Sequence, residues 1–534
     1  MLTGLPILTI IICAPIVGIL AILLMPKERV SWMRYGALAA SLLPLILSFI
    51  LFISYQPERG GQAFREVYDW LELPLDSGAL QLQYHLGLDG LSLCLLVLTA
   101  LLSVMAVLAS FVHIKKRFKA FYSLLLWLET GLLGLLLARD IGLFYLFMEM
   151  SLPAMFLLIG IWGGERREQA AGSFLVHHGL GSVLLLSAFV LLWTGGTAEG
   201  NLPESGHVLY NGSYESVQSR ITGPDTWASP LLGESGEDMV PPSGMSEGMK
   251  QLIFTLFIVG FLIRLPVVPL HGWLLRLYQQ APPAVIMLVV GGILQAAGYG
   301  LLRFGLFMFP DQAAAGSVIF GILGLLSLLY GGLAAMVQED FKSVIAYASI
   351  GQIGLVLLGI ASMNELGLTG ALVTMISLGL TSSLLILIVG SITERTGTAR
   401  LDDLGGLART MPYTSGILIA AGLAAIGIPG LSGFNGTLLT LLGLFDSMKG
   451  VAVALVLGLL PGFVYIPRAV LGVTFGTARE SDGSWNDARF IEAVPMIVLL
   501  AFVILLGVYP SLLMDQAAAS FSHLLSSLNT RIGG

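Results

Sequence analysis

The chain has 534 residues, of which 56% are apolar and only 11% are charged, and its mean hydropathy is +0.88. This composition excludes a water-soluble globular protein, a disordered chain and a nucleic-acid-binding protein. The formal net charge of −7 is spread over loops and not gathered into a tail, so it indicates no charged macromolecular partner. We therefore expect an integral membrane protein whose surroundings are the lipid bilayer.

Apolar runs of about 20 residues, the helix length that crosses a hydrocarbon core, recur along the whole chain. The expected fold class is therefore an all-α integral membrane protein with about 14 transmembrane helices. The runs expected to form them are 5–25, 32–54, 88–112, 119–138, 141–163, 171–194, 250–270, 280–306, 315–336, 342–361, 366–392, 412–445, 450–475 and 491–513.

The distribution of Lys and Arg indicates the orientation of these spans. With the N-terminus outside and the spans alternating, the inner loops hold roughly twice as many Lys and Arg residues as the outer loops, as the positive-inside rule requires. An even number of spans then places both termini outside. The segment from Thr197 to Met249, rich in Gly, Pro, Ser and acidic residues, is expected to form an external, partly disordered loop.

Two of the runs are interrupted by helix-breaking residues. The seventh contains Leu265 to His271 with two prolines, and the twelfth contains Gly427 to Gly433 with a proline and three glycines. Breaks at corresponding places favour two five-helix repeats, helices 4–8 and 9–13, although two ordinary proline kinks would give the same pattern. The expected units are 1–112 (helices 1–3), 113–310 (first repeat, with the external loop 195–250), 311–480 (second repeat) and 481–534 (helix 14 and tail).

No cofactor or metal site is expected in this chain. Cys13 and Cys94 both lie in apolar runs without a second thiol or a histidine at ligand spacing, which favours two small core residues. No glycine-rich nucleotide motif follows a strand, and there is no phosphate-binding loop. Any redox chemistry is therefore expected on other chains.

Two ionisable residues lie deep in apolar runs at places where they could meet. Glu149 lies near the middle of the fifth span, and Arg264 lies just before the break in the seventh. A charge at the bilayer centre costs roughly 2.5–3.5 kcal/mol on insertion scales, so each residue should have a partner. We expect an ion pair, which is either purely structural or part of a proton or ion path.

The other ionisable candidates are weaker. His271 follows the break in the seventh span and could relay protons or act as a hydrogen-bonded anchor beside Trp273. Arg139 and Asp140 look like an interfacial pair, and Glu129 lies deep in the fourth span. The second half has few charges, so a relay there would depend on water held by polar side chains: Gln352, Ser377, Ser382, Ser383, Asn435 and Thr437.

Several stretches resemble the antiporter-like membrane-arm subunits of respiratory complex I, in particular subunit M of bacterial NADH-quinone oxidoreductase, and their relatives in cation/proton antiporters. They are LFYLFME at 143–149, LIGIWGG at 158–164, LPVVPLHGWL at 265–274, AGYGLLRF at 297–304 and IAYASI at 345–350. The resemblance implies fourteen helices, two inverted five-helix repeats with broken helices 7 and 12, and proton translocation coupled to quinone reduction. It also implies a bacterial inner-membrane location, other membrane-arm subunits as partners, and NADH, flavin, iron–sulfur clusters and quinone on other subunits.

The family's proton-carrier positions are only partly kept. Glu149 matches the helix-five glutamate, and His271 and Trp273 also match, whereas Arg264 stands where the family has the lysine paired with that glutamate. A buried lysine can release a proton, whereas arginine stays charged, so Arg264 is expected to hold Glu149 without exchanging protons with it. Further substituted positions are Gln295 (central lysine), Gln352 and Leu378 (usual histidines), Thr437 (exit glutamate or lysine), and Arg276 and Gln280 (acidic positions).

Three functions remain open at this stage. The first is a membrane-arm subunit that contributes to proton translocation through Glu149. The second is a structural paralogue that completes such a complex without pumping, and the third is a subunit of a cation/proton antiporter or of an inorganic-carbon-uptake complex. Fold analogy does not decide among them, because function rests on the site.

Overall fold

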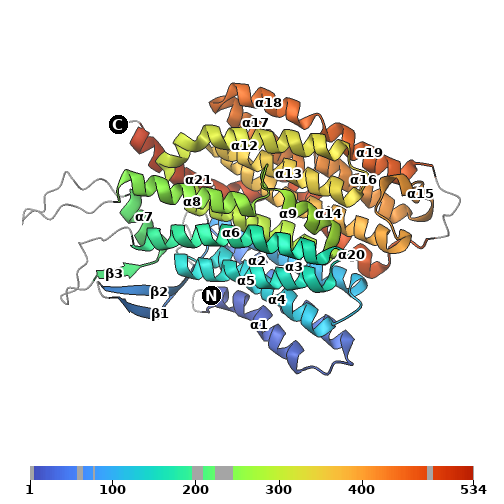
Figure 1. Ribbon diagram of the computed structural model, residues 1–534, viewed down its shortest axis with the longest axis horizontal. Coiled ribbons are helices and arrows are strands. Elements are labelled where there is room, and N and C mark those ends of the chain that lie inside the picture. Colours follow the sequence, from blue (N-terminus) through green and yellow to red (C-terminus); the bar gives the residue numbers. More distant parts are fainter. Residues whose placement is uncertain are drawn as a thin grey trace, which may run out of the picture.

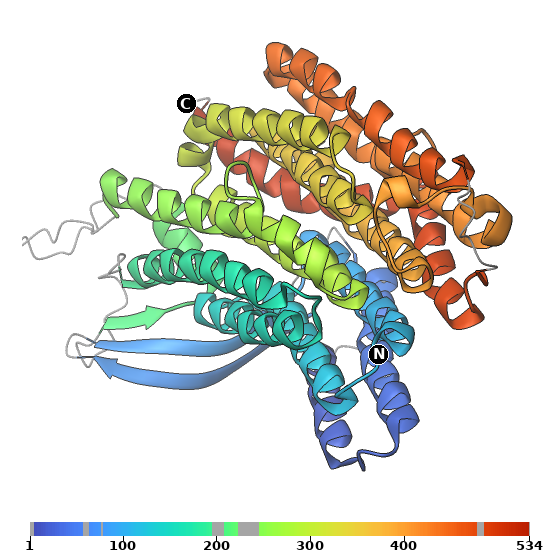
Figure 2. The same cartoon turned by 45° about the vertical axis from the view of Figure 1, so that its right-hand side comes forward.

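The computed structural model describes residues 5–56, 64–75, 78–194, 208–222, 245–477 and 485–532. Long helices lie side by side along one direction, and a small sheet projects beyond one end of them (Figures 1 and 2). Helices from the first half of the chain and helices from the second half form adjoining parts of one bundle (Figure 1). The mostly helical membrane fold expected from the sequence is confirmed.

The first half supplies the lower and front helices in Figure 1. Most of them are single long helices, whereas the segment after α9 is one continuous run whose hydrogen bonding alternates between α and π turns. The elements are α1 (Ile7–Leu24), α2 (Val30–Ser54), α3 (Gly90–His113), α4 (Phe118–Leu137), α5 (Ile141–Trp162), α6 (Arg167–Thr194), α7 (Tyr214–Thr222), α8 (Glu247–Arg264), α9 (Gly272–Gln280), α10 (Pro283–Leu288), η4 (Val289–Ile293), α11 (Leu294–Gly300) and η5 (Leu301–Leu306).

The second half supplies the remaining helices, which end in α21. The sequence predicts only a tail after residue 513, but the structure has a helix there, packed against α3 and α14. The elements are α12 (Pro310–Met336), α13 (Phe341–Ala361), α14 (Glu365–Thr396), η6 (Leu401–Asp403), α15 (Leu407–Thr410), α16 (Pro412–Ile426), α17 (Ser432–Ser447), α18 (Lys449–Leu459), α19 (Gly462–Phe475), α20 (Phe490–Val508) and α21 (Ser511–Ile532).

Twelve helical segments within the described residues are long and apolar enough to cross a membrane, and each overlaps one of the expected spans. The two expected spans outside this set are the interrupted ones, 250–270 and 412–445, where each helix is cut into shorter pieces. The total of fourteen spans and the inverted repeats stay predictions, which this pattern supports.

Both predicted helix breaks are present. After α8 ends at Arg264, the chain runs without helix to Gly272, where α9 begins. Between α16 and α17, Gly427 and Gly430 have φ of 84° and 89°, a left-handed conformation that side chains other than glycine rarely adopt. The breaks therefore follow from proline removing backbone donors and from glycine permitting the reversed turn.

A small sheet, which the sequence analysis did not predict, lies at the end of the bundle beside α7 (Figure 2). Strands β1 (Arg65–Leu75) and β2 (Gly78–Gly87) pair in antiparallel. Strand β3 (Val208–Asn211), from much later in the chain, pairs in parallel with β2. The carboxylate of Glu66 on β1 accepts hydrogen bonds from the backbone N–H groups of Leu8 (2.8 Å) and Thr9 (3.1 Å). Since a negative charge is favourable at a helix N-terminus, the sheet stabilises the start of α1.

The described part of the polar insertion belongs to this same end. Residues 208–222 form β3 and α7, while 195–207 and 223–244 lie outside the described residues, so the disorder expected there is not tested. The all-α expectation is thus correct for the membrane bundle and incomplete for the end where the sheet and α7 lie.

Helices α12 and α13 approach closely through glycine. A Cβ atom on Gly354 would lie 2.5 Å from the carbonyl oxygen of Gly324, whereas one on Gly351 would meet nothing nearer than 3.7 Å. Backbone-to-backbone contact of this kind is the usual way in which membrane helices gain packing energy.

We therefore expect Gly354→Ala to destabilise the protein by about 1–3 kcal/mol through overpacking. The measurement is the thermal unfolding midpoint in detergent. Gly351→Ala is the matched control, because it adds the same methyl group to the same helix without a clash. Equal midpoints for the two variants would contradict this account of the α12–α13 contact.

Candidate functional site

The structure brings Glu149 and Arg264 together inside the bundle. A guanidinium nitrogen of Arg264 lies 2.8 Å from a carboxylate oxygen of Glu149, so the predicted ion pair is present. The Arg264 side chain is 3% exposed and that of Glu149 is 29% exposed, so only the acid reaches the bundle surface. The guanidinium therefore depends on protein partners, and the carboxylate is the accessible end of the pair.

Ser182 on α6 is the third member of this site, and the sequence analysis did not identify it. Its hydroxyl lies 2.8 Å from the same Glu149 oxygen and accepts a hydrogen bond from Arg264 at 2.6 Å. It also lies 2.9 Å from the carbonyl oxygen of His178, so its single proton serves either Glu149 or that carbonyl. Residues of α5, α6 and α8 thus form one connected polar group.

Small residues allow α6 and α8 to approach closely enough for this contact. A Cβ atom on Gly181 would lie 3.1 Å from the carbonyl oxygen of Gly260 and 3.4 Å from Cγ of Arg264. Because α8 ends at Arg264, the arginine sits at the break, where the helix direction changes. The end of α8 and the glycine contact with α6 therefore position Arg264 beside Glu149 of α5.

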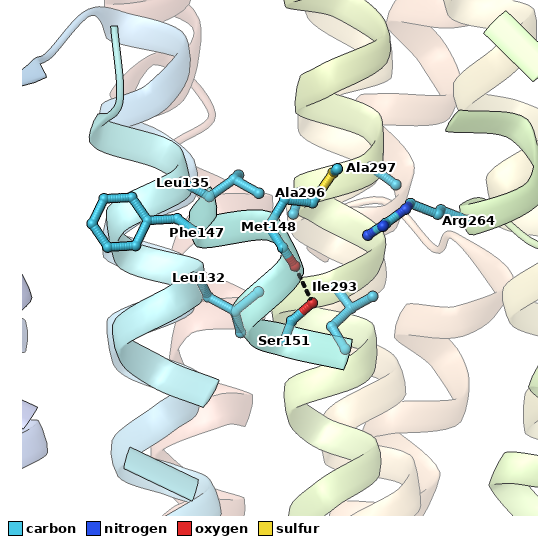
Figure 3. A pocket seen from close by; sticks show the side chains of 9 residues that line it. All are labelled: Leu132, Leu135, Phe147, Met148, Ser151, Arg264, Ile293, Ala296 and Ala297. Carbon is cyan, nitrogen blue, oxygen red and sulfur yellow. Dashed lines mark hydrogen bonds between the residues drawn. The ribbon is translucent and has the colours of Figure 1, made fainter. Parts of the chain in front are cut away.

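A small cavity lies beside Arg264, as Figure 3 shows. Its volume is about 10 Å³, and its walls are mostly apolar side chains of α4, α5, η4 and α11. The guanidinium points toward α5, where the Ser151 hydroxyl is already bonded to the carbonyl of Met148 (Figure 3). A space of this size holds at most one water, so the pair is shielded from bulk water on this side.

His178 on α6 is a second residue that the sequence analysis missed. It is 1% exposed, and neither ring nitrogen has a hydrogen-bond partner among the described residues. Its ring stacks on Phe174 with centroids 3.9 Å apart and meets Trp273 edge to face at 4.6 Å. His178 precedes Ser182 by one helical turn on the same face, so the helical period indicates it only once Ser182 is known to belong to the site.

Gln295, which the resemblance places at the family's central lysine, is not part of this group. Its side-chain amide donates hydrogen bonds to the carbonyl oxygens of Val290 (2.8 Å) and of Met375 on α14 (2.9 Å). The bond to Met375 holds α11 against the long helix of the second half, and the bond to Val290 uses the amide within its own helical run. The residue is a neutral tether between the two halves.

Gln352 and Thr437 do come together, in the second half. With Ser377 and Thr374 they line a cavity of about 60 Å³ at the break between α16 and α17. The Thr374 hydroxyl is buried and has no hydrogen-bond partner among the described residues. A cavity of this size with hydroxyl and amide walls can hold several waters.

The remaining candidates lie apart from the pair. His271 faces Tyr330 on α12 and Tyr347 on α13, with ring centroids 4.9 and 6.3 Å away. Glu129 is 1% exposed and accepts a hydrogen bond of 2.6 Å from Ser41 on α2. Neither side chain contacts Glu149 or Arg264 in any hydrogen bond or ion pair within the described residues.

The expected pair between Arg139 and Asp140 is wrong. Asp140 instead caps α5 by accepting from the backbone N–H groups of Gly142 and Leu143, while Arg139 bonds Asp89 at 3.1 Å. Asp89 also pairs with Arg303, whose guanidinium lies 4.9 Å from the ring centre of Tyr214 on α7. This cluster of Asp89, Arg139 and Arg303 joins α3, η5 and the described part of the polar insertion.

The two arginines of this cluster determine the ionisation of Asp89. Burial opposes ionisation of Asp89, but Arg303 and Arg139 outweigh it and hold the pKa of this carboxyl well below its usual range. The ionised form therefore stabilises the fold at any pH above the ordinary aspartate pKa of about 4. That stabilisation is lost only as the pH falls from there toward the lowered value.

Comparisons with known proteins agree with this architecture. Residues 138–460 match the family model described as NADH:quinone oxidoreductase/Mrp antiporter, TM, and residues 63–136 match NADH-ubiquinone oxidoreductase chain 4, amino terminus. The chain is 33% identical over 502 residues to NADH-quinone oxidoreductase subunit M of Rhodobacter capsulatus, covering 94% of this chain and 92% of that protein. It is also 30% identical to subunit M of Rickettsia prowazekii, covering 98% and 99%.

The chain belongs to the NADH-quinone oxidoreductase subunit M family. A chain of respiratory complex I from Thermus thermophilus superposes with a TM-score of 0.79 at 26% identity, covering 97% of this chain and 99% of that one. A chain of the Mrp complex from Dietzia sp. superposes with a TM-score of 0.77 at 19% identity, covering 100% and 98%, which shows a shared fold. Within the described part of this family member, no group of three or more His, Cys, Asp or Glu side chains is placed to hold a metal ion.

We expect Asp89→Asn to lower the free energy of unfolding by about 3–5 kcal/mol, because it leaves the buried Arg303 and the partly buried Arg139 without their counter-charge. Asparagine still caps α3, so the change removes charge and keeps the cap. The loss should be constant between about pH 5 and 8 and should shrink below about pH 4, where native Asp89 begins to lose its advantage. Thermal unfolding followed across this pH range measures it.

Ser92→Ala is the control for this prediction, because it removes the other half of the capping box without changing charge. It should cost about 1 kcal/mol at every pH. A pH-independent difference between Asp89→Asn and the native protein, extending below about pH 3, would contradict the role given to the two arginines.

Proposed function

We propose that the chain is a membrane-arm subunit of a bacterial proton-translocating NADH-quinone oxidoreductase and takes part in proton translocation through the site around Glu149. Family membership over nearly the whole chain supports the assignment to this assembly. The proposed location is the inner membrane, with both termini outside. NADH, flavin, iron–sulfur clusters and quinone are proposed to be held by other subunits.

The observation that carries the proposal is the partly exposed Glu149 carboxylate held by a buried guanidinium. Charges inside a membrane span are expensive and usually mark a functional path. A purely structural ion pair needs no access to the exterior, whereas this carboxylate is 29% exposed and also bonded to Ser182. The guanidinium on one side keeps the carboxylate in place, while the other side of the carboxylate is open to the outside of the bundle, as a group on a proton path requires.

The two halves contribute differently under this proposal. The first half holds fixed charge, since Arg264 stays protonated and Gln295 is neutral at every pH. The second half holds a neutral cavity of about 60 Å³ whose hydroxyl and amide groups can order water. Protons would therefore pass through the second half along water and not by way of titratable side chains.

A second candidate function is supported by the same substitutions. Gln295 bonds the α14 backbone in place of a mobile charge, which suits a subunit that completes the membrane arm without pumping. In that case the chain would be needed for assembly, and neutralising Glu149 would leave the number of protons moved per quinone unchanged.

The proposal predicts that Glu149→Gln lowers the number of protons translocated per quinone reduced. The amide keeps the shape of the side chain but removes the negative charge that pairs with Arg264. The measurement uses the complete complex in proteoliposomes, with proton uptake followed by a pH-sensitive dye and NADH oxidation followed in parallel.

Glu365→Gln is the matched control, because it makes the same change on an exposed residue in the first turn of α14. It should leave the ratio unchanged. If Glu149→Gln assembles normally and keeps the native ratio, the pumping role is wrong and the assembly role is favoured.

A further inference from the structure

We propose that His178 is the residue that gains and loses a proton beside the Glu149–Arg264 pair. This inference rests on the proposed function, because it names the group that carries the proton in the first half of the subunit. It explains how a site whose cation is an arginine can still change its charge.

Neither member of the pair changes its charge readily. Arginine does not release its proton under physiological conditions, so Arg264 is a permanent cation. Glu149 is bonded at 2.8 Å to both Arg264 and Ser182, so its carboxylate is already engaged by two donors. The pair as a whole is therefore neutral and stable, and a third group must carry the variable proton.

The imidazole of His178 lies in an environment that leaves both ring nitrogens free within the described part of the chain. The ring is almost completely buried, yet neither nitrogen has a hydrogen-bond partner among the described residues. Buried polar groups in proteins are nearly always bonded, and exceptions often have a catalytic or proton-handling role. An imidazole of this kind can accept a proton on either free nitrogen without first breaking a protein hydrogen bond.

Aromatic rings hold the imidazole in place and can stabilise its charged form. Phe174 lies parallel to it at 3.9 Å between centroids, and Trp273 meets it edge to face at 4.6 Å. A cation over an aromatic face is stabilised, most strongly when it is removed from water. The same rings leave a neutral imidazole well packed, so both protonation states fit the space.

Ser182 links His178 to the ion pair. The His178 carbonyl receives the Ser182 hydroxyl at 2.9 Å, and Ser182 contacts both Glu149 and Arg264. The helices packed against α6 are α5, α8 and α9. Of their charged groups, Arg264 lies near enough to act electrostatically on the imidazole, as does the neighbouring His177 of α6 itself, and Glu149 is linked to it through Ser182.

Protonation of His178 changes the charge of the site by one unit. One proton taken up from outside the bundle binds an imidazole nitrogen of His178, and the net charge of the three groups rises from zero to plus one. The imidazolium repels Arg264 and attracts Glu149, so the pair is loosened while the proton is present. Release of the proton returns all three groups to their first state.

The break in the seventh span is attached to this site. The indole N–H of Trp273 donates to the carbonyl oxygen of Ile263, the residue before Arg264, at 3.3 Å. Trp273 therefore contacts both the imidazole and the end of α8. A shift of α9 during turnover would move the ring that stabilises the charged histidine, which couples the occupancy of the proton site to the position of the break.

The decisive variant is His178→Phe in the complete complex. Phenylalanine keeps an aromatic ring between Phe174 and Trp273 but cannot bind a proton. The protons translocated per quinone should fall as far as in Glu149→Gln, and the double variant should fall no further, since both changes remove one path. His177→Gln is the control, because its ring is bonded to the Ser173 carbonyl at 2.8 Å, and it should keep the native ratio.

A second measurement does not depend on a His178 variant folding. The imidazole of His178 is followed by pH-difference infrared spectroscopy with labelled histidine, in native protein and in Glu149→Gln. Removal of the carboxylate charge leaves the imidazole beside Arg264 alone, so its proton affinity should fall by about tenfold or more. A histidine signal that is insensitive to Glu149 would overturn the proposal.

The outcomes separate this inference from the proposed function. If Glu149→Gln lowers the ratio and an assembled His178→Phe complex pumps normally, the histidine is a packing residue and the pumping function stands. If neither variant changes the ratio, the proposed function itself fails. If His178→Phe does not assemble, the infrared titration decides the question.

Discussion

The structure depends on the high free energy of an unpaired charge inside a membrane. Arg264 is 3% exposed, and its contacts with Glu149 and Ser182 join three helices that are otherwise held by apolar packing. The same rule applies at the bundle ends, where Asp89 holds Arg303 and Glu492 holds Arg395. Because each such group must meet its partner, the charged residues determine how helices distant in sequence are registered against one another.

The two halves of the bundle meet this constraint in different ways. The first half buries charge beside a space of about 10 Å³, while the second half has neutral hydroxyl and amide groups among the residues that line a cavity of about 60 Å³. Beside the smaller space the field of a fixed cation is strong, but there is room for at most one water to move protons. The larger cavity has room for more water, but in the described part of the chain no charged side chain lines it. The two cavities therefore suit different steps of the proposed transport.

Much of the fold follows from patterns that act locally along the chain. Apolar runs predicted the twelve uninterrupted spans, and proline and glycine predicted both breaks, because these effects depend on neighbouring residues. The Glu149–Arg264 pair was predictable because few charges lie in apolar runs. Ser182 and His178 were not, since their roles arise only where α5, α6 and α8 meet. Arg139 was assigned to its neighbour Asp140, although its partner Asp89 lies fifty positions earlier.

The substitution of neutral residues at the centre changes how the halves can communicate. A lysine at position 295 would transmit a signal as a moving charge, whereas Gln295 uses both amide donors to bind the carbonyls of Val290 and Met375. Any change at α14 then reaches α11 as a displacement of backbone, through hydrogen bonds that must be kept or broken. The π-helical turns on either side of α11 make this segment easier to displace than a regular helix. Mechanical coupling is therefore favoured here over electrostatic coupling, and it places the changeable charge away from the central helix, at the edge of the first half.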